Sequence, residues 1–557
     1  MYRNIFNKFR SNKFLRNLTL SLGYKFPNLI NWKTQIKKNK KKYLNLIKNN
    51  SGKKVLIAPV VTSDQILVSL HSLIGFSLTL KGAEVNYLTC NKSIMACTNA
   101  YNFAISNKEF LKDGPSKFCN SCHDCSYTLF KPLNKNFLQL NKYIDPVKIA
   151  ILKKFSKQID INKIKDFKED GINIGEHTMA GTLRYFASGT INYKNHDQCE
   201  VLRQYFLSAL IVKDSISNLL DKFNYDTVVI DHGMYIPQGI VAEVARKKGC
   251  KVKVIWVGYR RNTLMIVDDI TYHKSLLTEN LSNWKNLELD SEKKDKIIKY
   301  LNDRDSGKQD WEKFNKDPIQ EIDILKRNKK LDNRPIISLM TNVIWDAQLK
   351  FDQNIFTNQL EWIFKTVKYF EKRNDLQLVI RVHPAEVRPD MPASQKIIDE
   401  LNNKFEKLPQ NVKLIDGHEK FSSYSLSKIS KAVLVYATKL SFELPCFGQN
   451  VIVCGEAFAK NKGFTIDPTT EDEYFTILDN IKNIETLSRD KQDLAIKYSY
   501  HFFFRKSMEI SSLITNIKSY PPFKLKDNFF KIVENNEDPA IEKICENILN
   551  EKQAFLN

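Results

Sequence analysis

Apolar and polar positions follow two patterns along this chain, one typical of buried strands and one typical of amphipathic helices. Residues 54–61 are almost continuously apolar, which predicts a parallel strand that is buried on both faces. Asp64 then offers a helix N-cap, apolar side chains recur at helical spacing as far as Leu80, and Gly82 stands where a helix C-cap belongs. A second strand is predicted at residues 84–88. These segments together predict the β-α-β unit that begins a doubly wound domain.

The alternation of strands and helices continues in two series. The first closes near residue 275, with strands expected at 227–231 and 251–257 and helices at 204–220 and 239–248. In the second series we expect strands at 335–341, 376–382, 412–415, 432–435 and 450–453, with helices at 356–371, 393–405 and 439–444. The predicted fold class is therefore α/β, with two Rossmann-like doubly wound domains that face each other across a cleft, the architecture called GT-B.

Composition changes at the borders of these series. Residues 278–332 are highly charged and broken by Asn, Asp and Gly, which predicts a helical linker. An aromatic stretch at 498–505 has helical spacing and is interpreted as a packing surface. The predicted segments are a basic N-terminal arm (1–53), an N-terminal Rossmann-like domain (54–277), the charged helical linker (278–332), a C-terminal Rossmann-like domain (333–485) and C-terminal helices (486–557), with a helical pair beyond Pro521.

Length and hydropathy exclude a single core and a membrane span. The chain has 557 residues, of which 42% are hydrophobic, enough to fill two or three ordinary cores. No run approaches the ~20 apolar residues that a transmembrane helix needs. The N-terminus lacks an apolar core followed by a small-residue cleavage site, so we expect a cytoplasmic protein with reduced cysteines.

Positive charge is concentrated near the N-terminus. The net charge is +23, and residues 1–54 hold fifteen Lys and Arg and no acidic residue. Aromatic and leucine side chains lie between these cations, which suits an anionic membrane surface at about 1 kcal/mol per Lys or Arg. We therefore expect peripheral association with the inner face of a membrane. A solvated Lys-rich tail is the alternative. Nucleic acid is not expected, since the basic density stops where the globular part begins.

The segment at residues 378–386, Leu-Val-Ile-Arg-Val-His-Pro-Ala-Glu, joins a strand directly to a His-Pro turn. Open α/β sheets bind ligands at the carboxyl ends of their strands, and Pro384 fixes the turn that directs His383 toward such a site. His383 can donate to a phosphate oxygen, and Arg381 adds positive charge. The alternative is a histidine that only caps the following helix.

A second segment, Tyr436 to Leu444, follows another predicted strand. Small and hydroxylated residues, Thr438 among them, leave backbone N–H groups available for a donor phosphate. Glu443 lies one helical turn further and could accept hydrogen bonds from ribose, or it could be an ordinary exposed helix residue. The loop that follows carries Glu456 and Lys462 between two glycines and is expected to close over a sugar.

Two acid–histidine pairs are candidates for a general base in the N-terminal domain. Asp231 and His232 end a predicted strand and begin a turn, where a carboxylate could deprotonate an attacking hydroxyl. Glu176 and His177 are the rival pair, and either pair could instead be a satisfied polar turn. Asp268 and Asp269 are further candidates.

The cysteines of the N-terminal domain suggest a metal site. Gaps of two residues separate Cys119, Cys122 and Cys125, and Cys90 or Cys97 could complete four ligands. This spacing predicts a structural zinc ion. An iron–sulfur cluster fits the spacing less completely, because the usual fourth cysteine with a following proline is missing. Buried reduced thiols that only pack a loop are the remaining alternative.

Four motifs together resemble those of bacterial capsule-polysaccharide biosynthesis proteins, a group that includes the Kdo transferases of capsule linkers. They are Arg-Val-His-Pro-Ala-Glu at 381–386, Thr-Asn-Val-Ile-Trp-Asp at 341–346, the segment 231–246 and the segment 454–465. The resemblance spans roughly residues 54–505 and implies sugar transfer from a nucleotide donor held by the C-terminal domain. In CMP-sugar transferases a His-Pro dipeptide similar to His383-Pro384 contacts the donor phosphate, and similar elements occur in CDP-glycerol polymerases. The donor-binding residues expected on these grounds are Arg381, His383, Pro384, Glu386, Tyr436, Thr438, Glu443, Glu456 and Lys462.

The sequence therefore predicts a glycosyltransferase that moves a sugar from a nucleotide-activated donor to a surface polysaccharide. A CMP-sugar such as CMP-Kdo is favoured as donor, and the acceptor is expected to be lipid-linked or an oligosaccharide. No cofactor is expected to be required for transfer, since no Asp-X-Asp motif occurs in a convincing setting. The alternatives are a sugar-nucleotide epimerase or a CDP-glycerol-type polymerase of similar fold, and a non-enzymatic factor that binds or exports polysaccharide.

Overall fold

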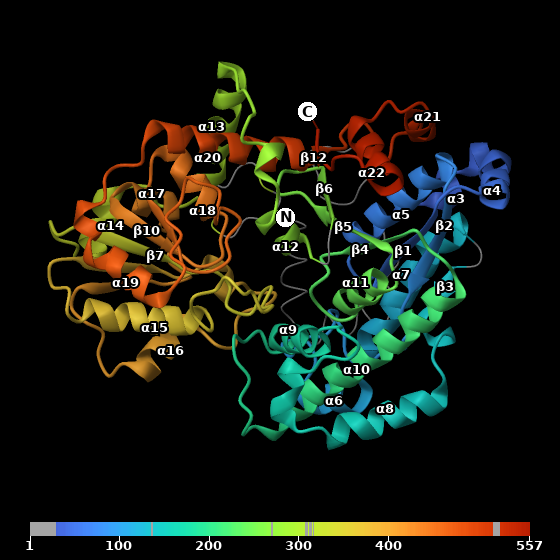
Figure 1. The fold of residues 1–557 in the computed structure, drawn as a ribbon, viewed down its shortest axis with the longest axis horizontal. Coiled ribbons are helices and arrows are strands. Elements are labelled where there is room, and N and C mark those ends of the chain that lie inside the picture. The colour runs from blue at the N-terminus through green and yellow to red at the C-terminus, as the bar shows by residue number, and fades with distance from the viewer. Residues whose placement is uncertain are drawn as a thin grey trace. The chain divides into compact units, whose positions relative to one another are not determined.

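The structure is a computed structural model of the chain and describes residues 29–134, 137–268, 271–306, 310, 315, 317–515 and 524–556. The chain divides into two compact units, coloured by position in Figure 1. The first unit contains the described residues before Ala187 together with Thr190–Ser275 and Arg505–Asn557. The second contains Ala187–Gly189 and Leu276–Phe504. The chain leaves the first unit within α12 (Tyr272–Leu277), close to the predicted boundary at residue 275.

The first unit is built on a seven-stranded sheet in the order β12-β6-β5-β4-β1-β2-β3. The five strands from β5 to β3 pair in parallel, whereas β6 and β12 join one edge antiparallel. The sequence pattern did not predict β3, β6 or β12. The strands are β1 (Lys54–Val60), β2 (Glu84–Thr89), β3 (Leu138–Gln139), β4 (Thr227–Asp231), β5 (Lys251–Val257), β6 (Thr263–Asp268) and β12 (Met508–Glu509).

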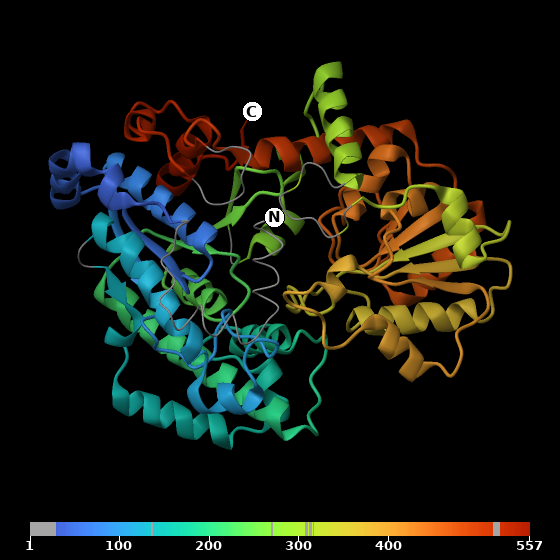
Figure 2. The ribbon, with the colours of Figure 1, turned by 180° about the vertical axis from the view of Figure 1, so that it is seen from behind.

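Helices cover both faces of this sheet. In Figure 1 and in the reverse view of Figure 2, α5 and α22 lie on one side of the sheet and α10 and α11 on the other. Asp64 caps α5 as predicted, since its side chain accepts from the N–H groups of Ile66 and Leu67. The helices are α3 (Trp32–Gln35), α4 (Lys40–Asn49), α5 (Gln65–Leu80), α6 (Asn107–Asp113), α7 (Ser116–Leu133), α8 (Pro146–Gln158), α9 (Ile174–Phe186), α10 (His196–Lys222), α11 (Gln238–Lys247), α21 (Phe529–Glu534) and α22 (Pro539–Asn550).

The second unit contains a five-stranded parallel sheet in the order β11-β10-β7-β8-β9. Its strands are β7 (Ile336–Met340), β8 (Gln377–Arg381), β9 (Val412–Ile415), β10 (Ser430–Val435) and β11 (Val451–Val453). Its helices are α13 (Ser291–Asp305), α14 (Ile322–Lys329), α15 (Gln359–Phe370), α16 (Ile397–Lys404), α17 (Ser423–Lys428), α18 (Leu440–Glu443), α19 (Glu471–Asp479) and α20 (Arg489–Tyr500).

Side chains that alternate along these strands enter two separate cores. Ile337, Leu339 and Ile380 pack with α15 and α19, whereas Ile336 and Val379 pack in a second cluster on the other face. Every position of β7 and β8 is buried, so these strands are covered on both faces, as in a doubly wound sheet. The prediction of two Rossmann-like doubly wound domains is confirmed.

Three predicted segment boundaries require correction. Residues 29–49 are not a separate arm, because Trp32 and Tyr43 are fully buried and stack on Phe76 of α5. The predicted linker is part of the second unit, in which Trp284 is buried. The predicted C-terminal helices are divided, since α20 belongs to the second unit and α21 and α22 to the first.

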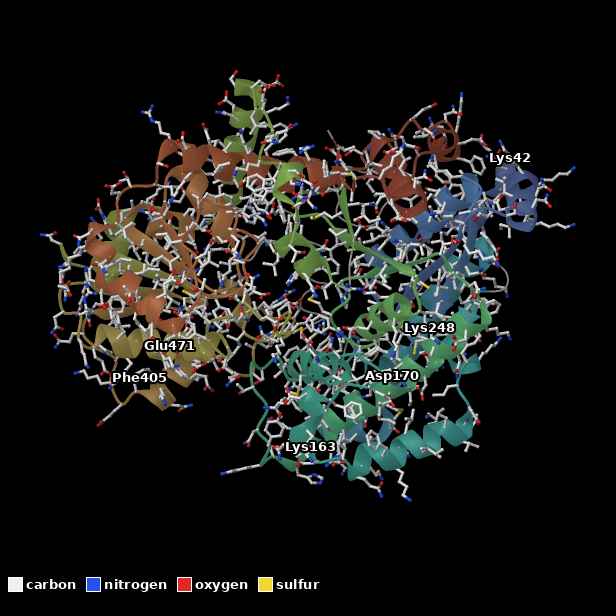
Figure 3. The ribbon with its side chains drawn as sticks, in the orientation of Figure 1. Lys42, Lys163, Asp170, Lys248, Phe405 and Glu471 are labelled. Atoms are coloured by element: carbon white, nitrogen blue, oxygen red, sulfur yellow. The ribbon has the colours of Figure 1, made fainter. Side chains whose placement is uncertain are left out.

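The predicted membrane contact rests partly on residues 1–28, which lie outside the described residues. In the described part, the lysines of α3, α4 and the turn between them are exposed, and Figure 3 labels Lys42 among them. Several of these lysines line one shallow surface groove: Lys38, Lys41, Lys42 and Lys48. Among the described helices, none has both the length and the apolar character to cross a bilayer.

Candidate functional site

The carboxyl ends of three neighbouring strands meet in the second unit. Strand β7 lies between β10 and β8, and the chain runs from β7 to β8 and β9 before it crosses back to β10. Such a reversal of strand order leaves a crevice at the carboxyl edge of an α/β sheet, where ligands bind. Thr341 and Asn342 follow β7, His383 follows β8, and Thr438 and Lys439 follow β10.

His383 is held in one tautomer by its own turn. Its backbone N–H donates to Thr341 Oγ1 at 2.9 Å, which ties the ends of β8 and β7 together. Its Nδ1 accepts from the N–H of Ala385 at 3.1 Å, as the N-cap of the 3₁₀ turn Pro384–Val387. Because Nδ1 is the acceptor, a neutral ring carries its proton on Nε2. The imidazole therefore presents a donor, which is what a phosphate oxygen requires.

The ring stays neutral over the physiological range. Burial is the largest cause, and the charges of Lys439, Arg381 and Arg388 add to it, so that the pKa of His383 falls to about 3. The same cations raise the positive potential around the ring. A neutral N–H donor in a positive field is suited to bind an anion without itself changing charge.

Three residues at this edge were not among the predicted site residues. Thr341 orients His383, Asn342 accepts from the N–H of Ala437 through Oδ1 at 3.3 Å, and Lys439 contributes charge. In the sequence, the feature that could have identified these residues is their position just after apolar strands. Thr438, which was predicted, lies beside them and accepts from the N–H of Leu440 at 3.4 Å.

Arg381, Glu386 and Tyr436 are engaged within the fold. The Arg381 guanidinium is buried and donates to the carbonyls of Val382, Asp416 and Glu419 at 2.7–3.0 Å. Glu386 accepts from the N–H of Ile397 at 3.1 Å, and burial raises its pKa to about 7. The Tyr436 hydroxyl donates to the carbonyl of Phe356 at 3.2 Å. These contacts support the loops around His383, and a direct role in donor binding stays a prediction.

Glu443 is a buried ion-pair partner rather than an exposed helix residue. Its side chain is 1% exposed, lies 3.1 Å from Arg304 Nη2 and accepts from the hydroxyl of Tyr424 at 2.5 Å. Glu456 accepts from the N–H of Gln353 at 3.1 Å. Lys462 is buried, with Nζ 3.3 Å from the carbonyl of Leu277 and over the ring of Tyr498. Their predicted donor contacts remain predictions.

In the first unit, Asp231 ends β4 and is almost fully buried. Both carboxylate oxygens lie 3.3 Å from Nε2 of Gln238, and Oδ2 lies 3.3 Å from Nε2 of His232. Burial raises the pKa of Asp231 to about 7. A carboxyl group with this pKa is half ionised near neutral pH, which suits a general base.

His232 has the same local geometry as His383. Its Nδ1 accepts from the N–H of Met234 at 3.1 Å, so the neutral ring carries its proton on Nε2, toward Asp231. Burial, and then the charge of Arg184, lowers the pKa of His232 to about 3. The predicted pair Asp231–His232 is thus brought together as a neutral imidazole beside a carboxyl group.

The rival pair, Glu176 and His177, is not brought together. His177 lies against Glu243 rather than Glu176, with Nε2 3.5 Å from Glu243 Oε1 and Nδ1 donating to the carbonyl of Met234 at 2.6 Å. Burial lowers the pKa of His177, but the hydrogen bond and charge of Glu243 outweigh burial and raise it on balance. Of the further candidates, Asp268 pairs with Lys253 at 2.5 Å, and Asp269 lies outside the described residues.

Four of the five predicted thiol ligands line one cavity of the first unit: Cys90, Cys97, Cys119 and Cys122. Burial first, and then the neighbouring thiols, raise the pKa of Cys90 to about 11 and that of Cys119 to about 12. Cys125 is fully buried and does not line this cavity. Within the described ranges, no three His, Cys, Asp or Glu side chains are grouped so that they could hold a metal ion. The predicted zinc ion stays a prediction.

No family model matches the chain, and no curated protein matches its sequence. Solved structures to which it is similar include the β-Kdo 2,4 transferase KpsC of Thermosulfurimonas dismutans, at 14% identity, with 56% of this chain and 88% of that chain covered and a TM-score of 0.34. They also include MnaA of S. aureus with UDP, at 11% identity, 91% and 100% coverage and a TM-score of 0.28. A putative UDP-N-acetylglucosamine 2-epimerase from Listeria monocytogenes is 11% identical, with 90% and 98% coverage and a TM-score of 0.26.

Proposed function

We propose that the chain is a glycosyltransferase that moves a sugar from a nucleotide-activated donor to a surface polysaccharide. The observation that carries this proposal is His383, a neutral imidazole with a fixed Nε2–H at the carboxyl edge of a parallel sheet, next to Lys439. The motif resemblance to capsule-polysaccharide enzymes points to the same residue. We favour a CMP-sugar such as CMP-Kdo as the donor.

In glycosyl transfer the bond between the sugar and the nucleoside phosphate breaks, and negative charge grows on the departing phosphate. A hydrogen-bond donor aimed at that oxygen stabilises the transition state more than the ground state. In the proposed reaction, His383 Nε2–H fills this role and Lys439 adds charge. Thr341 keeps His383 in place through its hydrogen bond to the backbone N–H.

The acceptor hydroxyl must lose a proton during the reaction. Asp231 in the first unit is the proposed base, because its pKa of about 7 leaves it ionised in part at neutral pH and able to take the proton. The proposed role of His232, whose Nε2 lies 3.3 Å from Asp231 Oδ2, is to orient that carboxylate. The proposed acceptor is lipid-linked or an oligosaccharide, and the exposed lysines of α4 are the proposed contact with an anionic membrane.

The test is the thermal unfolding of wild type, His383→Ala and His196→Ala with CMP, UDP, GDP and CDP-glycerol. A ligand at ~100 times its dissociation constant stabilises the native state by roughly 2.7 kcal/mol. We expect one nucleotide to stabilise the wild type and the His196→Ala control, whose histidine is exposed in the first unit, but not His383→Ala. If no nucleotide stabilises the wild type, the transferase proposal fails.

A second measurement separates transfer from epimerisation. Wild-type protein is incubated with the stabilising sugar nucleotide without any acceptor, and the sugar is analysed for a change of configuration. A transferase leaves the sugar unchanged until an acceptor is added, whereas an epimerase converts the donor alone. Conversion in the absence of acceptor would therefore replace the proposal by the epimerase alternative.

A further inference from the structure

Four thiols from three separate segments surround one small cavity in the first unit. Cys90 directly follows β2, Cys97 lies in the loop beyond it, and Cys119 and Cys122 lie on α7. The cavity has a volume of about 20 Å³, and its walls also include Thr62 and His123. The lining of this cavity includes none of the residues proposed for sugar transfer.

The local structure explains why these thiols converge. The N–H of Cys90 donates to the carbonyl of Val60 at 2.9 Å, which holds the carboxyl end of β2 beside that of β1. On α7, Cys119 and Cys122 are three residues apart and share a face with His123 and Ser126. Cys125 lies on the same helix but outside the cavity. The fold therefore selects two of the three cysteines of α7 as possible ligands.

Two of the sulfur atoms accept hydrogen bonds from the backbone. The N–H of Thr62 lies 3.2 Å from Cys122 Sγ, and the N–H of Ser93 lies 3.3 Å from Cys90 Sγ. A neutral thiol is only a weak acceptor, whereas a thiolate bound to a metal centre is commonly stabilised by such donors. The backbone around Cys90 and Cys122 thus already supplies the donors that stabilise metal-bound thiolates.

The size of the cavity distinguishes a single ion from a cluster. Zinc binds sulfur at about 2.3 Å, so four thiolates arranged for one zinc ion leave no room for a water-sized sphere between them. Here such a sphere fits, and within the described residues no three donors are grouped closely enough for one ion. Iron–sulfur clusters take four cysteine ligands around several metal and sulfide atoms, and hold them further apart. We propose that Cys90, Cys97, Cys119 and Cys122 bind an iron–sulfur cluster.

The metal and sulfide content of the purified protein tests the proposal directly. The full-length chain is purified without oxygen, and iron, acid-labile sulfide and zinc are measured per chain, together with visible absorption and electron paramagnetic resonance before and after reduction. We expect iron and sulfide in similar amounts and an absorption that bleaches on reduction. Zinc without sulfide, or no metal even after anaerobic reconstitution with iron and sulfide, overturns the proposal.

Single cysteine-to-serine variants identify which thiols bind the cluster. Cys122→Ser and Cys97→Ser are expected to lose most of the iron and sulfide, whereas Cys125→Ser, one turn further along α7, keeps them. Far-ultraviolet circular dichroism reports whether each variant is folded. If Cys122→Ser does not fold, Cys97→Ser carries the comparison, because its residue lies in a loop. Full iron and sulfide in the folded ligand variants, or equal loss in Cys125→Ser, contradicts the assignment.

Discussion

The same hydrogen bond fixes a histidine in each unit. In both His232 and His383, Nδ1 accepts from the backbone N–H two residues later, and both residues follow a buried strand. The bond leaves the proton of the neutral ring on Nε2. A local turn therefore decides which nitrogen donates, so that neither histidine depends on a distant residue to select its tautomer.

Asp231 is the residue at which activity and stability should respond in opposite directions. Its carboxyl group has a native pKa of about 7 against an ordinary value of 3.8. Between these values the native state binds a proton that the unfolded state has lost, so stability falls as the pH rises from about 4 to 7. In Asp231→Asn, position 231 no longer titrates, so this decrease in stability with pH is absent. We expect the variant to be more stable than wild type above pH ~8, by at most about 4 kcal/mol.

The same variant should lose sugar transfer by about 10²–10⁴-fold, because it cannot accept a proton. Denaturant unfolding below pH ~5 and above pH ~8, with steady-state rates at the higher pH, measures both effects. A matched control is Asp221→Asn, whose residue is an exposed partner of Lys248 in the first unit. Unchanged transfer by a stable Asp231→Asn protein would exclude Asp231 as the base.

The local sequence pattern predicted that His383 and Asp231 follow or end buried strands. It did not predict that Arg381 and Glu443 are buried and bonded to other residues of the fold. A strand that ends in a polar residue is visible in the sequence, and the carboxyl edge of the sheet follows from the fold. Two of the three carbonyls that Arg381 contacts lie 35 and 38 residues later in the chain, and Glu443 pairs with Arg304. Such contacts depend on tertiary packing, which hydrophobic periodicity does not encode.

At the scale of elements, strands were predicted more accurately than helices. The bounds of β4, β5 and β9 agree with the predicted ones, because buried parallel strands are continuous apolar runs. The short helices α3 and α4 escaped prediction, since seven lysines between residues 33 and 48 obscure three buried apolar side chains: Trp32, Ile36 and Tyr43.

These buried side chains predict that residues 29–49 contribute to the stability of the first unit. Trp32 stacks on Phe76 at 4.8 Å and donates to Ser72 Oγ at 2.9 Å. Trp32→Ala should therefore cost about 3–5 kcal/mol and lower the melting temperature, whereas Lys41→Ala, on the exposed side of α4, should change it little. Differential scanning calorimetry compares them. Equal melting temperatures would mean that these helices are dispensable for folding.

At the scale of the whole molecule, the first unit is assembled from segments at both ends of the chain. Residues Arg505–Asn557 supply β12, α21 and α22, and the two helices cover α5. The predicted helical pair beyond Pro521 thus completes a core that begins near the N-terminus. Sequence pattern located this pair but could not show which domain it joins, because an amphipathic helix does not specify its partner.

Deletion of residues 505–557 should damage one unit and spare the other. Without α21 and α22, the apolar surface of α5 around Phe76 is exposed and the first unit loses its stability. The second unit keeps all its strands. Limited proteolysis with mass spectrometry should therefore degrade the first unit and leave a fragment close to 276–504. Equal resistance of both units in the truncated and full-length proteins would contradict this division.

The interleaved order of the units has a consequence for synthesis on the ribosome. Domains usually fold from the N-terminus as they emerge, but here residues 505–557, which are made after the second unit, belong to the first unit. The second unit is complete in sequence once residue 504 has left the exit tunnel, while the nascent first unit still lacks the helices that cover α5. The apolar surface of the incomplete first unit therefore stays uncovered until residues 505–557 have been made. A product that stops before residue 505 would then be aggregation-prone, even though every residue of both proposed sites had been made.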